Sequence, residues 1–307
     1  MILVGTASVM AGVCGGTSEQ ANAQAQAEPD EGFAAGSAWL DEDWRIFESK
    51  VRFADEAGLA DLSMGETAAR IGETFVGTEY IPATLEQPGP ESLVINFRAL
   101  DCVTFVENVL AIARFAREHG AETLSDRAAA EAAYERYLTE LRYRGGVLDG
   151  YPSRLHYFSE WLTDNESAGL VRVVTSELEP ARDAEPVNFM SRHPDAYRQL
   201  ADPEVLAAIE EMETRLNAGG PRLYVPEDRL ADVADGIMNG DVIAARSTLA
   251  GLDIAHTGLA FWKDGNLHLL HAPLVGDSVE VSERPLAERI VGLGSQDGVM
   301  VARPLDR

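Results

Sequence analysis

The sequence predicts an α+β fold, in which helices of the first part of the chain pack against an antiparallel sheet or half-barrel. Between residues 38 and 217, apolar residues recur at helical spacing in several segments. After Gly236 the chain changes to short β-prone runs, such as GDVIAAR, HTGLAFW and VMVARPL, separated by turns such as DGN and GDS. Elements segregated in this way are typical of α+β proteins.

The start of the chain is expected to lie outside this fold. Residues 2–13 are apolar and small, and they are too short to span a membrane comfortably. They are typical of a signal-peptide core, and the sequence ANA at residues 21–23 fits the cleavage pattern. We therefore predict a signal peptide over residues 1–23, followed by a flexible linker over residues 24–37.

These features predict an exported protein, with the periplasm as its compartment. Lipid attachment through Cys14 is the alternative, although Val13 departs from the small residue usual before a lipidated cysteine. No basic residue precedes the apolar core, which leaves open whether Met1 is the true start. The sequence predicts no further membrane anchor.

The composition limits the classes of function. The net charge is −26, and the only lysines are Lys50 and Lys263, which makes nucleic acid a poor partner. Once a signal peptide is removed, Cys102 is the single cysteine, so no internal disulfide is expected. A lone thiol in an exported protein requires an explanation.

Helical periodicity predicts two helices before this cysteine and one that begins at it. The first two cover residues 38–60 and 63–75, and Ser63 and Glu66 have the spacing of a capping box. The third begins after Asp101, a good N-cap residue, and ends at Gly120.

Cys102 is thus expected at the N-terminus of the third helix. The unpaired N–H groups and the positive end of the helix dipole favour a thiolate there, and the thiolate is the nucleophilic form. The alternative is a buried core cysteine, because cysteine is among the most buried residue types.

The middle of the chain is expected to alternate between helices and short extended runs. Helices are predicted over residues 121–144 and 203–217, and a strand is predicted at VRVVTSEL. VNFMSRHPDAYRQL is predicted to form a strand that leads into a short helix after Pro194. Residues 142–165 are dense in Arg, Tyr, His, Trp and Asp, as in ligand sites, although a loop with aromatic anchors has the same mix.

Two histidines are candidates to act with Cys102. His256 enters one predicted strand, and His271 lies on the next, after a turn at Lys263. His268, three residues before His271, should face the opposite side of the sheet. A cysteine nucleophile needs a base, and the base needs an orienting group, and these residues supply all three types. Zinc is the chemical rival, yet the sequence has no H-E-x-x-H and no paired C-x-x-C.

The ordered set DCVTFVE, HTGLAF and HLLHAP resembles the NlpC/P60 superfamily of papain-like cysteine peptidases and amidases. The closer similarity is to its DUF1460 branch, the N-acetylmuramoyl-L-alanine amidase-like family. That similarity includes RYRGGVLDGYPSRLHYFSEWLTDN, FMSRHPDAY and GDVIAARSTLAGLDIAHTGLAF, and it covers about residues 65–305. His271 precedes Ala-Pro, where the family more often has Ala-Ser.

The resemblance implies a papain-like fold and a role for six residues. The fold would be a single catalytic domain over residues 38–307, with a large, mostly helical insertion at about 121–235. Roles are carried over by position: Cys102 matches the nucleophile, His256 the base, His271 the orienting residue, Tyr80 an oxyanion donor, and Arg154 and His156 lie in the segment expected to contact substrate.

The resemblance also implies a reaction. It is hydrolysis of the amide bond between the N-acetylmuramoyl group and L-alanine in peptidoglycan fragments, with 1,6-anhydro-muropeptides as substrates and no metal or other cofactor. Two alternatives stay open at this point. One is a γ-D-glutamyl–diamino acid endopeptidase, and the other is a catalytically inactive module that binds the cell wall.

Overall fold

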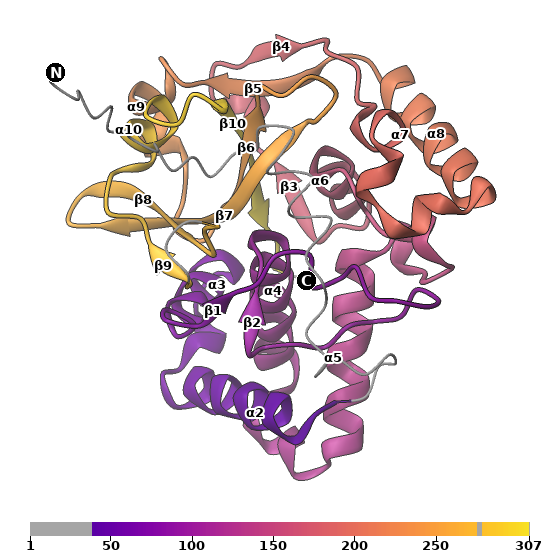
Figure 1. Cartoon of the computed structure of the whole chain (residues 1–307). Coiled ribbons are helices and arrows are strands. Elements are labelled where there is room, and N and C mark those ends of the chain that lie inside the picture. Colours follow the sequence, from indigo (N-terminus) through magenta and orange to yellow (C-terminus); the bar gives the residue numbers. More distant parts are fainter. Residues whose placement is uncertain (1–38, 275–277, 307) are drawn as a thin grey trace, which may run out of the picture.

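The computed structural model describes residues 39–274 and 278–306 (Figure 1). The predicted signal peptide, the linker and Cys14 lie outside these residues. Within the described ranges, no helix is both long enough and apolar enough to cross a membrane.

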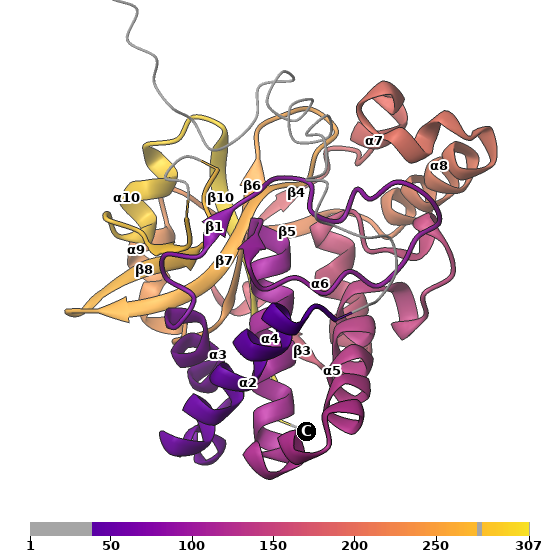
Figure 2. The ribbon, with the colours of Figure 1, turned by 60° about the horizontal axis from the view of Figure 1, so that its bottom comes forward.

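Four helices form one half of the molecule, and their bounds are α2 (Asp41–Glu56), α3 (Met64–Glu73), α4 (Cys102–His119) and α5 (Arg127–Arg142). The central one is α4, which contacts the other three (Figures 1 and 2). Every residue of α4 from 104 to 116 is buried. Burial on all sides holds the start of α4 in a fixed position at the boundary with the sheet.

Side-chain caps define where α3, α4 and α5 begin. The Asp101 carboxylate accepts a hydrogen bond from the Thr104 N–H at 2.8 Å, and the Thr104 hydroxyl accepts one from the Asp101 N–H at 2.9 Å. This reciprocal capping box starts α4 at Cys102, as predicted. Ser63 caps α3 by accepting from the Glu66 N–H at 3.2 Å.

The other half is an antiparallel sheet of eight strands in the order β4-β5-β10-β6-β7-β8-β9, with β3 also paired to β10. Five strands follow Gly236, as predicted: β6 (Val242–Ser247), β7 (Ile254–Lys263), β8 (Asn266–His271), β9 (Glu280–Val281) and β10 (Gln296–Pro304). The other three come from the segment predicted as an insertion: β3 (Val171–Val173), β4 (Ala181–Asp183) and β5 (Arg222–Pro226). That segment is therefore partly built into the sheet.

Both faces of the sheet are covered. Leu259 and Leu270 face the helical half, whereas their neighbours Ala260 and Leu269 belong to a second apolar core on the opposite face. This alternation is the two-residue period of a strand buried on both sides. The second core is covered by two short helices, α9 (Leu230–Val233) and α10 (Leu286–Val291), which the periodicity did not predict.

The predicted strand at VNFMSRH is wrong. Residues 189–192 form the short helix α7 (Phe189–Arg192), and 3₁₀ turns follow it. The N–H groups of Asn188 and Phe189 both donate to the Gly251 carbonyl, which leaves no strand ladder there. The apolar residues of this segment pack against α8 (Pro203–Ala218) rather than against the sheet. One further helix, α6 (Phe158–Ser167), lies between α5 and β3 in the chain.

A two-stranded parallel pair connects the helical half to the sheet edge. It consists of β1 (Glu79–Tyr80) and β2 (Ala99–Leu100), and β2 leads directly into Asp101 and α4. The preceding backbone is bonded to the segment before β9: the Gly77 N–H donates to the Val279 carbonyl at 2.9 Å, and the Val279 N–H donates to the Thr78 carbonyl at 2.8 Å. The chain around Tyr80 is therefore held from two sides.

Candidate active site

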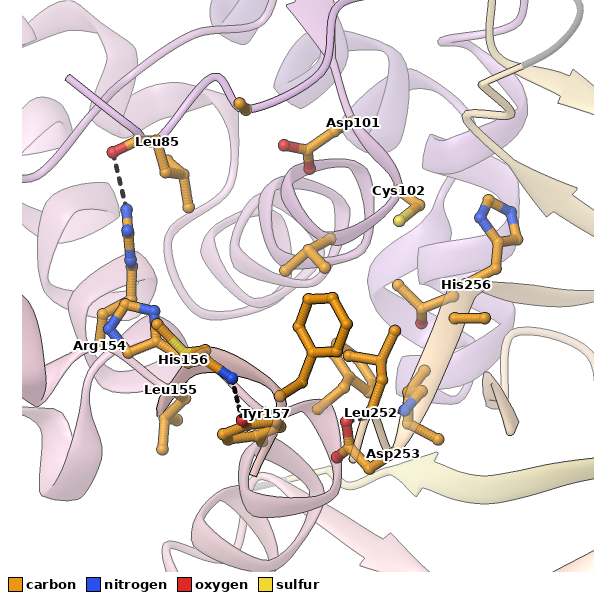
Figure 3. A pocket seen from close by; sticks show the side chains of 18 of the residues that line it. Leu85, Asp101, Cys102, Arg154, Leu155, His156, Tyr157, Leu252, Asp253 and His256 are labelled. Atoms are coloured by element: carbon orange, nitrogen blue, oxygen red, sulfur yellow. Dashed lines mark hydrogen bonds between the residues drawn. The ribbon is translucent and has the colours of Figure 1, made fainter. Parts of the chain in front are cut away.

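A cavity of about 250 Å³ lies where the start of α4 meets β7 and the segment before α6. Five of the six predicted site residues line it: Tyr80, Cys102, Arg154, His156 and His256. Figure 3 shows the last four of them. These residues are up to 176 positions apart in the sequence (256 minus 80) and come from four segments of the chain. The fold thus brings together at one cavity five candidate residues that lie far apart in the sequence.

Cys102 is the first residue of α4 and is only partly buried. The Asp101 cap satisfies the Thr104 N–H, while the thiol sits beside the positive end of a helix of 18 residues. In Figure 3, Cys102 and His256 lie at one side of the cavity, and Arg154 and His156 lie at the other. A thiol at this location has the environment that favours the nucleophilic thiolate.

His256 and His271 are joined by a hydrogen bond between His256 Nε2 and His271 Nδ1 at 2.8 Å, with the two rings nearly perpendicular at 84°. The β7–β8 hairpin brings them together, as predicted. Burial, with the Arg289 guanidinium adding to it, lowers the pKa of His256 to about 3. Burial also lowers the pKa of His271 well below its usual value. Both imidazoles are therefore neutral at pH 7.

Gly258 makes room for this pair. A Cβ atom at Gly258 would lie 2.7 Å from the Leu270 carbonyl oxygen and 2.9 Å from the His271 Cβ, closer than real Cβ contacts. The HTG sequence therefore combines the imidazole of His256 with the space that His271 needs. His268 lies elsewhere, as its spacing predicted, and its Nδ1 is 2.8 Å from the Ser282 carbonyl oxygen.

Tyr80 reaches the cavity from β1. Its backbone pairs with Leu100, two residues before Cys102, so the tyrosine and the start of α4 are held in register. The parallel pairing of β1 with β2 was not predicted, because each strand has only two residues. The role of Tyr80 as an oxyanion donor stays a prediction.

Arg154 is bonded to neighbouring groups of the protein. Its guanidinium donates to the Leu85 carbonyl at 2.7 Å, forms an ion pair with Glu86, and lies 3.6 Å from Glu91. It also stacks over the Tyr151 ring, 4.8 Å from the centroid. Because the side chain is only 5% exposed, this charge is balanced internally. Its contact with substrate remains a prediction, and the structure gives it a structural role.

His156 has one nitrogen engaged. Its Nε2–H donates to the Tyr151 carbonyl at 2.8 Å, which leaves Nδ1 as the acceptor. Burial lowers the pKa of His156 well below its usual value, and the Arg154 guanidinium lowers it further. His156 is thus a neutral hydrogen-bond acceptor at the cavity wall.

Four carboxylates also line the cavity, and sequence reasoning missed three of them as site residues: Glu86, Glu107 and Asp253. Each has a structural partner. Glu107 is paired with Arg142 at 2.6 Å, and Asp253 accepts from the N–H of Ser159 at 2.7 Å. No local sequence signal could identify them, because their partners are 35 and 94 residues away. Among the described residues, no group of three or more His, Cys, Asp or Glu side chains is placed to hold a metal ion.

Comparison with known families identifies the family of this chain. The model of the AmiA-like family, described as N-acetylmuramoyl-L-alanine amidase-like, matches residues 70–292, well over half of the chain. The chain belongs to the AmiA-like family. Family membership makes it an amidase-like hydrolase with a mixed α+β fold. No curated protein matches it.

Solved structures similar to this AmiA-like chain include an N-acetylmuramoyl-L-alanine amidase from Bacteroides uniformis. The two are 36% identical with a TM-score of 0.70, and the match covers 79% of this chain and 99% of the other. A Bacteroides fragilis protein, provisionally named a xylanase, is 36% identical with a TM-score of 0.69, over 76% of this chain and 98% of its own. A Legionella pneumophila protein described under the DUF1460 family is 21% identical with a TM-score of 0.60, over 84% and 94%, and shows the fold alone.

Proposed function

We propose that this chain is a cysteine amidase of the NlpC/P60 type with a papain-like fold. Its reaction would be hydrolysis of the N-acetylmuramoyl–L-alanine amide bond in peptidoglycan fragments. One observation carries the proposal: the thiol at the start of α4 shares a cavity with His256, whose Nε2 is bonded to His271. Because Nε2 of His256 is engaged, Nδ1 is the nitrogen left to exchange a proton with Cys102.

The mechanism follows from these positions. His256 Nδ1 takes the thiol proton while Cys102 Sγ attacks the carbonyl carbon of the substrate amide. The oxyanion is stabilised by the Cys102 N–H at the helix N-terminus and by the Tyr80 hydroxyl. The C–N bond then breaks, and His256 returns the proton to the leaving amine of alanine. Water attacks the resulting thioester, gives a proton to His256, and releases the lactyl carboxylate and the thiol.

The carboxylates at the cavity support this chemistry over a two-carboxylate glycosidase. A glycosidase requires a pair of acids that can act as general acid and as base or nucleophile. Here Asp101 caps α4, Glu86 and Glu107 are paired with arginines, and Asp253 accepts backbone N–H groups. Each carboxylate is occupied structurally, which disfavours a xylanase reaction in this cavity.

The proposed substrates are 1,6-anhydro-muropeptides, as the family resemblance implies. The end of the cavity formed by Arg154 and His156 would receive the part of the substrate beyond the scissile bond. His156 Nδ1 would accept a hydrogen bond from a substrate N–H or O–H group. Arg154, through its bonds to the protein, would keep this wall of the cavity in place. Export to the periplasm, in soluble form or lipidated at Cys14, is part of the same proposal.

The test uses the mature chain, residues 24–307, with EDTA present. It is incubated with an anhydro-muropeptide and with the reduced, non-anhydro counterpart, and the products are identified by mass spectrometry. Cys102→Ala should lower the rate by about 10⁴-fold or more, as loss of a nucleophile does. His256→Asn should cause a similar loss, and His193→Asn, at an exposed histidine, is its matched control.

Each outcome has a defined meaning. Release of a peptide that begins with intact L-alanine, by the parent chain and not by Cys102→Ala, supports the amidase. Cleavage inside the peptide would replace it with the endopeptidase. Cleavage of neither substrate, with Cys102 reacting no faster with an alkylating agent than an ordinary thiol, would contradict the proposal.

A further inference from the structure

The second nitrogen of His271 is buried without a hydrogen-bond partner. His271 is 1% exposed, and its Nε2 faces the Glu280 Oε1 at 3.7 Å. Glu280 is the cross-strand partner of His271 in the β8–β9 pair, so the backbone itself aligns the two side chains. A buried N–H or lone pair that remains unpaired is destabilising, which makes this position unusual.

The proposed reaction determines which atom of His271 carries the proton. His256 can take a proton at Nδ1 only if its own hydrogen is on Nε2. That hydrogen is then donated to His271 Nδ1, across the 2.8 Å contact. His271 must in turn carry its hydrogen on Nε2, which is the atom that faces Glu280.

We propose that Glu280 is a positioning residue of this site, which holds the His271 Nε2–H tautomer and thereby keeps His256 Nδ1 unprotonated for Cys102. The inference rests on the proposed function for its catalytic consequence, but the tautomer it predicts does not depend on the substrate. The Glu280 side chain is 44% exposed, and a small rotation of it would shorten the 3.7 Å contact to a hydrogen bond.

Charge supports the same role. When His256 takes the thiol proton, it becomes a cation in a buried place, and the neutral His271 cannot offset that charge. Glu280 is the carboxylate placed beside the pair, whereas the Arg289 guanidinium, together with burial, disfavours protonation of both imidazoles. In a triad whose third member is an aspartate, that aspartate supplies a negative charge beside the protonated histidine. A Cys–His–His arrangement has no such charge, and Glu280 would supply it.

The experiment compares Glu280→Ala, Glu280→Gln and Glu280→Asp in the full chain, with Glu283→Ala as the matched control. Glu283 is an exposed carboxylate on the same segment, three residues further along the chain. Three readouts are taken: ¹⁵N chemical shifts of the His256 and His271 rings, the alkylation rate of Cys102 by iodoacetamide, and kcat and KM for an anhydro-muropeptide.

Glu280→Ala should shift His271 away from the Nε2–H tautomer and lower both the alkylation rate and kcat by about tenfold, as loss of an outer partner of a functional imidazole does. KM should stay within about twofold, because no substrate contact is removed. Glu280→Gln keeps an acceptor without the charge, so the tautomer should persist while kcat falls. Glu280→Asp should recover part of the rate, and Glu283→Ala should match the parent.

Parent-like tautomers and rates in Glu280→Ala would overturn the inference, even if the parent cleaves muropeptides. Conversely, a changed tautomer and slower alkylation in a protein that cleaves no muropeptide would retain the inference and reject the proposed function. If Glu280→Ala unfolds, Glu280→Met takes its place, because it removes the acceptor but keeps the volume of the side chain; parent-like tautomers and rates in Glu280→Met would overturn the inference in the same way.

Discussion

The two ends of the cavity differ in how their polar groups are bonded. At one end, His256 and His271 are neutral and share a single hydrogen bond. At the other end, Arg154 is charged, and the protein supplies it with a carbonyl group and two carboxylates. Both ends contain a neutral, buried histidine, yet only at the first end does that histidine lie on the same side of the cavity as Cys102.

This difference distinguishes reactive groups from wall-forming groups. Removing a buried charge that is paired on several sides is strongly destabilising. Its partners in the protein, however, leave few of its hydrogen-bond donors available to a ligand. A neutral imidazole carries no charge that burial would destabilise, and the lone pair of its unprotonated nitrogen can accept a proton or a hydrogen bond. The presence of an arginine in a cavity therefore does not by itself indicate an anion site, and three experiments can test this view.

The largest effect is expected for Arg154→Met. It leaves the carboxylates of Glu86 and Glu91, whose side chains are 17% and 4% exposed, without their cation, so the free energy of unfolding should fall by about 3 kcal/mol. Arg52→Met, which removes an exposed i,i+4 pair with Glu48, should cost less than about 0.5 kcal/mol. Urea unfolding measures both. An unchanged stability of Arg154→Met with a raised KM would instead make the guanidinium a substrate contact.

A smaller effect is expected for Tyr80→Phe, at the reactive end. Loss of one oxyanion donor should lower kcat by about 10²-fold with little change in KM. Tyr197→Phe removes a hydroxyl from the other part of the cavity wall and should leave kcat unchanged. Steady-state kinetics on a muropeptide compares the two. Equal kcat values for Tyr80→Phe and the parent would remove Tyr80 from the mechanism.

The smallest effect concerns stability against pH. His256 titrates near 6.5 when unfolded and at about 3 when folded, so the unfolded chain binds the proton first as pH falls. The stability that depends on neutral His256 is thus present above pH 6.5 and lost as pH falls towards 3. Between pH 7 and 5, the parent should lose about 2 kcal/mol more than His256→Asn. Parallel curves for the two proteins would show that His256 is not desolvated.

Local chemistry made part of the site predictable. Asp101 is a strong N-cap, so the start of α4 and the place of Cys102 followed from a few neighbouring residues. The turn after Lys263 aligned two strands, and this brought His256 close to His271. The family resemblance then assigned roles that spacing alone could not.

The rest depends on contacts between distant segments. The partner of Arg154, Glu86, is 68 residues away, and no periodicity links the two. The segment at residues 187–193 is apolar and β-prone, yet the Gly251 carbonyl binds its N–H groups and converts it into a turn of helix. Likewise, β3 and β5 join the sheet by pairing with β10, and β4 joins it by pairing with β5. These pairings are between distant segments, so local strand propensity does not predict them.

The backbone bonds between Gly77, Thr78 and Val279 have a consequence for the order of assembly. They connect the chain near Tyr80 to the strand that carries Glu280, about two hundred residues later. During synthesis, the helix with Cys102 emerges long before the strands with His256 and His271. A partly made chain therefore contains Cys102 without His256, and the proposed site is complete only when the last strands have paired.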